Sequence, residues 1–167
     1  HHRERLLRRR PETLLRPGLG TRERRRLPAL RAVPALYVGR EPLLALTDTL
    51  EAAEKDGVII RVISAYRSGE RQRRVYLKAV ENDGASQRYS APPGHSEHQL
   101  GTTVDFVDPD QKELFTQEFA ATPQGKWLVK NARRFGFIQS YTRENEHKTG
   151  YIPEPWHWRY VGGYSTS

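Results

Sequence analysis

Apolar residues recur at helical spacing over residues 41–56 and form a continuous run directly afterwards. The helix expected over 41–56 would bury one face, made of Leu43, Leu46, Leu50 and Ala53. Gly57 is a typical helix stop. The run 58–65 is apolar and rich in β-branched residues, which favours a buried strand. This part of the chain therefore predicts a helix followed by a core strand.

The same order of helix and strand follows, with a longer connection. A helix is expected over about 70–81, with three residues facing inward: Val75, Ala79 and Val80. The Asn, Gly, Ser and Pro residues of 82–95 predict a loop. Residues 102–107 have the composition of a strand.

The last third of the domain mixes short elements. Helices are expected over 113–121 and 124–134, a short strand over 137–141 and a last strand over 156–161, while 143–155 is polar and irregular. Strands and helices therefore alternate unevenly, with a long interruption before the last strand. This pattern favours an α+β fold, with a small, mainly antiparallel sheet flanked by helices, over a doubly wound sheet.

The net charge of +8 is concentrated at one end of the chain. Residues 1–34 hold 11 Arg against three Glu, and the remainder holds 17 basic and 17 acidic residues. We therefore divide the chain into a basic N-terminal arm, 1–35, and a domain, 36–167. The arm could attract an anionic polymer, although a solvated arm that adds solubility is the simpler interpretation. The balanced charge of the domain argues against specific nucleic-acid binding.

Composition narrows the chemistry further. Cysteine is absent, which excludes thiolate catalysis, disulfides and Cys–zinc sites and leaves His, Asp and Glu as metal ligands. No apolar stretch is long enough for a transmembrane segment. The chain begins with His1 and without a secretion signal, which indicates a mature form or a fragment.

Two segments hold residues that could bind a metal. His98 lies just after the predicted loop 82–95 and Asp105 lies on the strand that follows, with Gly101 allowing a sharp turn between them. Zinc accepts imidazole nitrogen and carboxylate oxygen at about 2 Å. A His and an Asp so placed are also often a hydrogen-bonded structural pair. Spacing alone leaves both interpretations open.

The second segment surrounds His157, which lies between Trp156 and Trp158 on the last expected strand. Pro155 argues against a helix, so this is not a helical HExxH site. Adding His157 to the first pair satisfies the three-ligand rule for catalytic zinc, and Glu154 could accept a proton from water if the backbone bends. The alternative is a buried His in an aromatic cluster, with Glu154 exposed.

In this order, the motifs Ser-x-His-x6-Asp and Glu-x-x-His resemble those of the zinc D-alanyl-D-alanine carboxypeptidase family. This family includes vancomycin-resistance carboxypeptidases and cell-wall L,D-carboxypeptidases, within a wider group of lysostaphin-type enzymes and the hedgehog domain. The similarity covers about residues 36–163. It rests on four segments in family order: Ser64–Ser68, Pro93–Gln99, Arg134–Ile138 and Glu154–Gly162.

The resemblance implies a site and a fold of the hedgehog and D-Ala-D-Ala-peptidase type. One zinc ion would be bound by His98, Asp105 and His157. Glu154 would act as general base, and Arg67 would stabilise the oxyanion through its fixed, charged guanidinium. Substrate contacts would come from a further set: Ser96, Gln72, Tyr66 and Trp156.

The resemblance also implies an activity, a substrate and a location. Zinc-dependent hydrolysis of peptidoglycan stem peptides would release C-terminal D-Ala, and this substrate places the protein in the cell envelope. Three alternatives stay open: an L,D-carboxypeptidase acting on tetrapeptide stems, a cell-wall endopeptidase, and a non-catalytic zinc-containing module that binds the wall. Glu154 and Arg67 favour an enzyme over the last of these.

Overall fold

The computed structural model describes residues 40–110 and 115–163. The predicted arm 1–35 and its boundary with the domain lie outside the described residues. In chain order the elements are α4 (Arg40–Lys55), β1 (Arg61–Ser64), α5 (Gly69–Asp83), the 3-10 helix η2 (Glu97–Leu100), β2 (Thr103–Val107), the 3-10 helix η3 (Gln117–Ala121), α6 (Pro123–Asn131), the 3-10 helix η4 (Ala132–Phe135), β3 (Phe137–Gln139), α7 (Glu146–Thr149) and β4 (His157–Tyr160). Among the described helices, none is long and apolar enough to cross a membrane.

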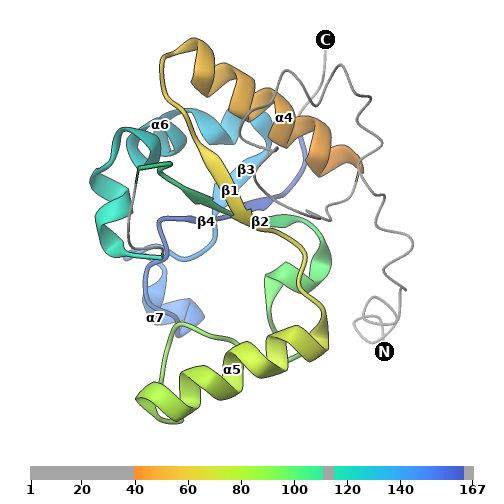
Figure 1. Ribbon diagram of the computed structural model, residues 1–167, viewed down its shortest axis with the longest axis vertical. Helices are drawn as coiled ribbons and strands as arrows, with labels where there is room; N and C mark the ends of the chain where they lie inside the picture. The colour runs from red at the N-terminus through yellow and green to blue at the C-terminus, as the bar shows by residue number, and fades with distance from the viewer. Residues whose placement is uncertain (1–39, 111–114, 164–167) are drawn as a thin grey trace.

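The strands form one sheet in the order β1-β2-β4-β3 (Figure 1). Each neighbouring pair is antiparallel, which confirms the predicted α+β class. In the central pair, Asp105 of β2 lies opposite His157 of β4, and Val104 lies opposite Trp158. Because side chains alternate between the two faces of a strand, the sheet has one polar face and one apolar face here.

The apolar face of the sheet forms the core with α4 and α6. The strands contribute Val62, Val104, Phe106, Phe137, Trp158 and Tyr160. The inward face of α4 is the one predicted: Leu43, Leu46, Leu50 and Ala53 are all buried. Trp127 and Leu128 of α6 complete the cluster. Helix α5 lies apart from this layer, at the bottom of the view in Figure 1.

The prediction that Val75 of α5 faces inward is wrong. Val75 is 37% exposed, Val80 is half-buried, and only Ala79 of the predicted three is buried. The other buried position of α5 is Gln72, whose amide is hydrogen-bonded. An inward-facing glutamine does not register in a hydrophobic pattern, so this buried position of the helix was missed.

Other segments also differ from the prediction. The strand expected over 137–141 ends at Gln139, and the helix expected over 124–134 divides into α6 and η4. Strand β1 is shorter than 58–65 and has an irregular register between Val62 and Ser64. The helix expected over 113–121 is only η3 in the described residues, because Phe115 adopts φ 58°, a left-handed conformation that a right-handed helix excludes. The segment expected to be irregular, 143–155, contains the short helix α7.

Candidate active site

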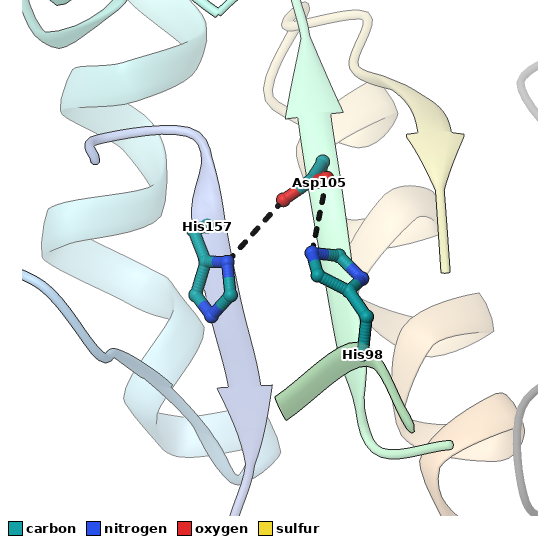
Figure 2. Close-up of side chains that lie close together, drawn as sticks. All are labelled: His98, Asp105 and His157. Atoms are coloured by element: carbon teal, nitrogen blue, oxygen red, sulfur yellow. Dashed lines mark ion pairs between the residues drawn. The ribbon is translucent and has the colours of Figure 1, made fainter. Parts of the chain in front are cut away.

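His98, Asp105 and His157 converge at the polar face of the sheet (Figure 2). Each offers a ligand atom, and these atoms lie within 4.8 Å of one another. Nε2 of His98 is 3.1 Å from Oδ2 of Asp105, and Nδ1 of His157 is 3.5 Å from Oδ1. All three residues are buried, with exposed fractions of 2–4%. The three predicted ligands therefore form one buried cluster.

Local structure explains this convergence. The β2–β4 register sets Asp105 beside His157. The hydroxyl of Ser96 caps η2 by accepting from the backbone N–H of His98 at 3.4 Å. Gly101, at φ 72°, ends η2 in a left-handed conformation that suits glycine, and the chain then enters β2. The sharp turn expected at Gly101 is thus the feature that brings His98 over the strand that carries Asp105.

The outer ring nitrogen of each histidine has an acceptor. Nδ1 of His98 is 2.6 Å from the carbonyl oxygen of Ala65, and Nε2 of His157 is 2.8 Å from Oε2 of Glu97. Carbonyl and carboxylate oxygens only accept, so these outer nitrogens carry the protons. The inner nitrogens, Nε2 of His98 and Nδ1 of His157, are then the atoms that can offer a lone pair to a cation held beside Asp105. Metal-binding histidines are oriented in this way.

The donor set fits a zinc ion. Within the described part of the chain, Oδ1 of Asp105 is buried and has no hydrogen-bond partner. A buried carboxylate oxygen without a donor is costly unless a cation neutralises it. Two imidazole nitrogens beside one carboxylate oxygen are the ligand types that catalytic zinc uses, with a further position left for water. His98, Asp105 and His157 could therefore hold one such ion.

Glu154 lies at the edge of the cluster. Its Oε2 is 3.3 Å from Nδ1 of His157, and the residue is 7% exposed. The backbone bends as this contact requires, because the N–H of His157 donates to the carbonyl of Glu154 and the N–H of Glu154 donates to the carbonyl of Tyr141. Burial raises the pKa of Glu154 to about 7. A carboxyl group with such a pKa can accept and return a proton near neutral pH.

Arg67 is held beside the cluster. Its backbone N–H donates to the carbonyl of His98 at 2.9 Å, which ties the segment after β1 to η2. Its guanidinium lies 3.9 Å from Oδ2 of Asp105. Burial lowers the pKa of Arg67, and the carboxylate of Asp105 opposes this shift. An arginine remains charged in proteins, so a fixed cation lies beside the candidate metal site.

Gln72 fixes the direction of the Arg67 side chain. Oε1 of Gln72 accepts from Nη1 of Arg67 at 2.8 Å, and Nε2 of Gln72 donates to the carbonyl of Ala91 at 2.6 Å. A second guanidinium nitrogen donates to Oγ of Ser64 at 3.3 Å. Two supports at different nitrogens hold the plane of the guanidinium.

A cleft of about 520 Å³ lies over the cluster. Predicted site residues line it: Arg67, Gln72, Ser96, His98, Asp105, Glu154, Trp156 and His157. Its wall also includes a mainly apolar set that was not predicted: Val75, Tyr89, Phe115, Tyr141, Tyr151 and Ile152. Tyr66 is half-buried and is not among the described residues that line the cleft. Eight of the nine predicted residues therefore share one cavity.

Sequence reasoning missed Glu97, the acceptor for His157. It precedes a candidate ligand directly, yet its partner lies 60 residues further along the chain. Nothing in a single sequence shows that contact, although an acidic residue beside a candidate histidine ligand could have been examined as its support.

A buried cluster of two imidazoles and a carboxylate, flanked by an acid and an arginine in a cleft, is typical of metal-dependent hydrolases. Comparison with known proteins narrows this class. The family described as VanY, D-alanyl-D-alanine carboxypeptidase, matches residues 36–163. The chain belongs to this family, as the resemblance of its motifs predicted.

Curated relatives and solved structures agree with this placement. The chain is 37% identical over 128 residues to the putative carboxypeptidase YodJ of Bacillus subtilis and to a D-alanyl-D-alanine carboxypeptidase of Enterococcus faecalis. These matches cover 75% and 70% of this chain but 47% and 46% of the relatives. The chain thus spans about half the length of the curated relatives it matches.

Two solved structures show the same fold. The LdcB LD-carboxypeptidase has a TM-score of 0.69 at 36% identity, with 75% of this chain and 60% of that chain covered. The vancomycin-resistance D,D-pentapeptidase VanY, an E175A mutant in complex with Zn(II), has a TM-score of 0.65 at 34% identity, with 75% and 73% covered.

Proposed function

We propose that this chain is a zinc carboxypeptidase that removes C-terminal D-Ala from peptidoglycan stem peptides. Its family membership and the names of its relatives support this activity. The observation that carries the proposal is the buried cluster of His98, Asp105 and His157, with the carboxylate of Glu154 3.3 Å from His157. In this proposal the three residues of the cluster hold one zinc ion.

The residues have complementary roles in peptide hydrolysis. Zinc, when bound, polarises the scissile carbonyl and lowers the pKa of water. Glu154 takes a proton from the attacking water, whose oxygen bonds to the carbonyl carbon. Arg67 donates hydrogen bonds to the carbonyl oxygen as negative charge develops on it. Glu154 then gives the proton to the departing amine as the carbon–nitrogen bond breaks.

Substrate contacts follow from the lining of the cleft. Ser96 and Trp156 face the cavity and could contact the peptide directly. Gln72 also lines it, but its amide already bonds Arg67 and Ala91, so we assign it to the orientation of Arg67. The predicted contact of Tyr66 with substrate stays a prediction without support from the cleft. A cell-envelope location follows from the proposed substrate.

A second candidate activity is cleavage of tetrapeptide stems between a diamino acid and D-Ala. The structural likeness to the LdcB LD-carboxypeptidase, at 36% identity, favours it. The two activities differ in the residue that precedes the scissile bond, so a substrate pair separates them. A pentapeptide stem ending in D-Ala-D-Ala tests the first, and a tetrapeptide stem ending in one D-Ala tests the second.

The decisive experiment follows products of both stems by mass spectrometry, for the zinc-loaded protein and two variants. Glu154→Gln keeps the shape of the side chain and removes the base, so turnover should fall about 10²- to 10⁴-fold with zinc content unchanged. Glu70→Gln is the matched control, because Glu70 is exposed and pairs only with Arg74 among the ion pairs described. Full activity of Glu154→Gln would refute its role as base. Cleavage of neither stem by the parent protein would refute the proposed function.

A further inference from the structure

We propose that Glu97 is a positioning residue of the metal site, which holds the His157 ring with Nδ1 toward the metal. The inference rests on the proposed function, because it assigns a role within the proposed zinc site. Glu97 is not itself a ligand, since its carboxylate lies on the outer side of the ring, at Nε2. Its effect on the site would act through His157.

The contacts of Glu97 suit a carboxylate and no other side chain. Oε2 lies 2.8 Å from Nε2 of His157 and accepts from Oγ of Ser140 at 2.6 Å. Oε1 accepts from Nη1 of Arg159 at 2.9 Å. All three partners donate, and an ionised carboxylate is a side chain that only accepts. The surroundings of Glu97 therefore match both of its oxygens.

The location of Glu97 links the two halves of the site. It is the first residue of η2 and directly precedes His98, so one short turn supplies a candidate ligand and the support for another. Arg159 lies two residues after His157 on β4 and thus points to the same side of the sheet. Ser140 follows β3, the strand beside β4. Residues from three neighbouring segments thus hold one carboxylate.

An amide at position 97 would lose this match. Glutamine has one acceptor oxygen and an NH₂ group that only donates, so at least one of the three donors would face another donor. If the NH₂ group faces Arg159, His157 keeps an acceptor, but a neutral and weaker one. If the NH₂ group faces Nε2 of His157, the ring could turn, or carry its proton on Nδ1, the atom that faces Asp105. Either change removes a lone pair from the proposed metal position. Loss of such a supporting carboxylate typically weakens metal binding 10- to 100-fold.

The test measures zinc affinity separately from folding. Glu97→Gln is compared with the parent protein and with Glu70→Gln, by chelator competition for the zinc dissociation constant and by thermal melting in EDTA. We expect a 10- to 100-fold weaker zinc affinity for Glu97→Gln, with a metal-free melting temperature close to that of the parent. Glu70→Gln should match the parent in both. A purely structural role for Glu97 would instead lower the metal-free melting temperature and leave zinc affinity unchanged.

A spectroscopic readout tests the ring directly. In the zinc-loaded parent, ¹H–¹⁵N NMR of the imidazoles should show a protonated, hydrogen-bonded Nε2 for His157, and Glu97→Gln should shift or lose this signal. If Glu97→Gln does not fold, Ser140→Ala serves instead, because it removes one donor from Oε2 and should weaken zinc binding several-fold.

Parent-like zinc affinity in the folded variant would overturn the positioning role alone. Absence of zinc binding in the parent protein would refute the proposed function itself, so the two failures are distinguishable.

Discussion

Gly136 should tolerate no side chain, and the cost of adding one can be worked out from its surroundings. The residue has φ 86°, and a Cβ at this position would lie 2.6 Å from Cε2 of Tyr160 and 2.9 Å from the carbonyl oxygen of Gly162. The left-handed conformation costs an alanine about 1–2 kcal/mol. Overpacking in a filled core adds about 1–3 kcal/mol. Gly136→Ala should therefore lower the free energy of unfolding by about 2–5 kcal/mol.

The overlap is costly because Tyr160 is held from several sides. The residue is 7% exposed, and its ring lies 5.5 Å from that of Phe137 in an edge-to-face contact. Its hydroxyl donates to Oε1 of Glu41 at 2.6 Å, which ties β4 to α4. A shift of the ring away from a new methyl group would disturb both contacts.

Urea unfolding of the metal-free protein in EDTA measures this cost. Gly57→Ala is the matched control, because Gly57 has φ 76° and a Cβ there meets no described atom within 4 Å. The free energy of unfolding of the control should fall only by the conformational cost of the left-handed backbone, about 1–2 kcal/mol. Equal destabilisation of the two variants would refute this prediction, because it would show that the overlap with Tyr160 costs nothing beyond the unfavourable φ of the alanine.

Three further outcomes test the site. His157→Ala should lose zinc, and metal analysis that finds a full equivalent would exclude this ligand. Arg67→Lys keeps the positive charge but loses the forked guanidinium that donates to Gln72, so kcat should fall about 10- to 100-fold with zinc retained. An unchanged kcat would show that Arg67 does not stabilise the oxyanion. Arg88 donates to Oε1 of Glu146 and to the carbonyl of Gly150, and these bonds join two segments beside the cleft. Arg88→Ala should raise KM several-fold and change the free energy of unfolding by less than about 1 kcal/mol. A KM like that of the parent would show that these hydrogen bonds do not support substrate binding.

The parts of the fold that sequence could predict are those with a local signature. Helix α4 was expected because its apolar residues repeat on one face, and Leu46 and Leu50 are buried as that repeat requires. Strand β2 was expected from its composition. The candidate ligands were found because motif order, rather than spacing alone, pointed to them. In each case the signal lies within a few consecutive residues.

The parts that could not be predicted depend on contacts between distant segments. Gln72 is buried because Arg67 and Ala91 satisfy its amide, and no hydrophobic scale anticipates this. Glu97 supports His157 only because η2 and β4 meet in the folded chain. The bend that returns Glu154 to the site is fixed partly by the carbonyl of Tyr141. Contacts of this kind become visible only in the tertiary structure.

The pairing of β2 with β4 has a consequence for the fidelity of folding. Asp105 lies opposite His157, while the next pair, Val104 and Trp158, faces the core. A slip of one residue in β4 would turn the imidazole of His157 into the apolar layer and bring the indole of Trp158 to the polar face. A molecule paired in this wrong way would lose its core contacts and a candidate ligand in the same event. Errors in this pairing are therefore disfavoured by folding and by metal binding alike, so that molecules able to load a metal are those that paired correctly.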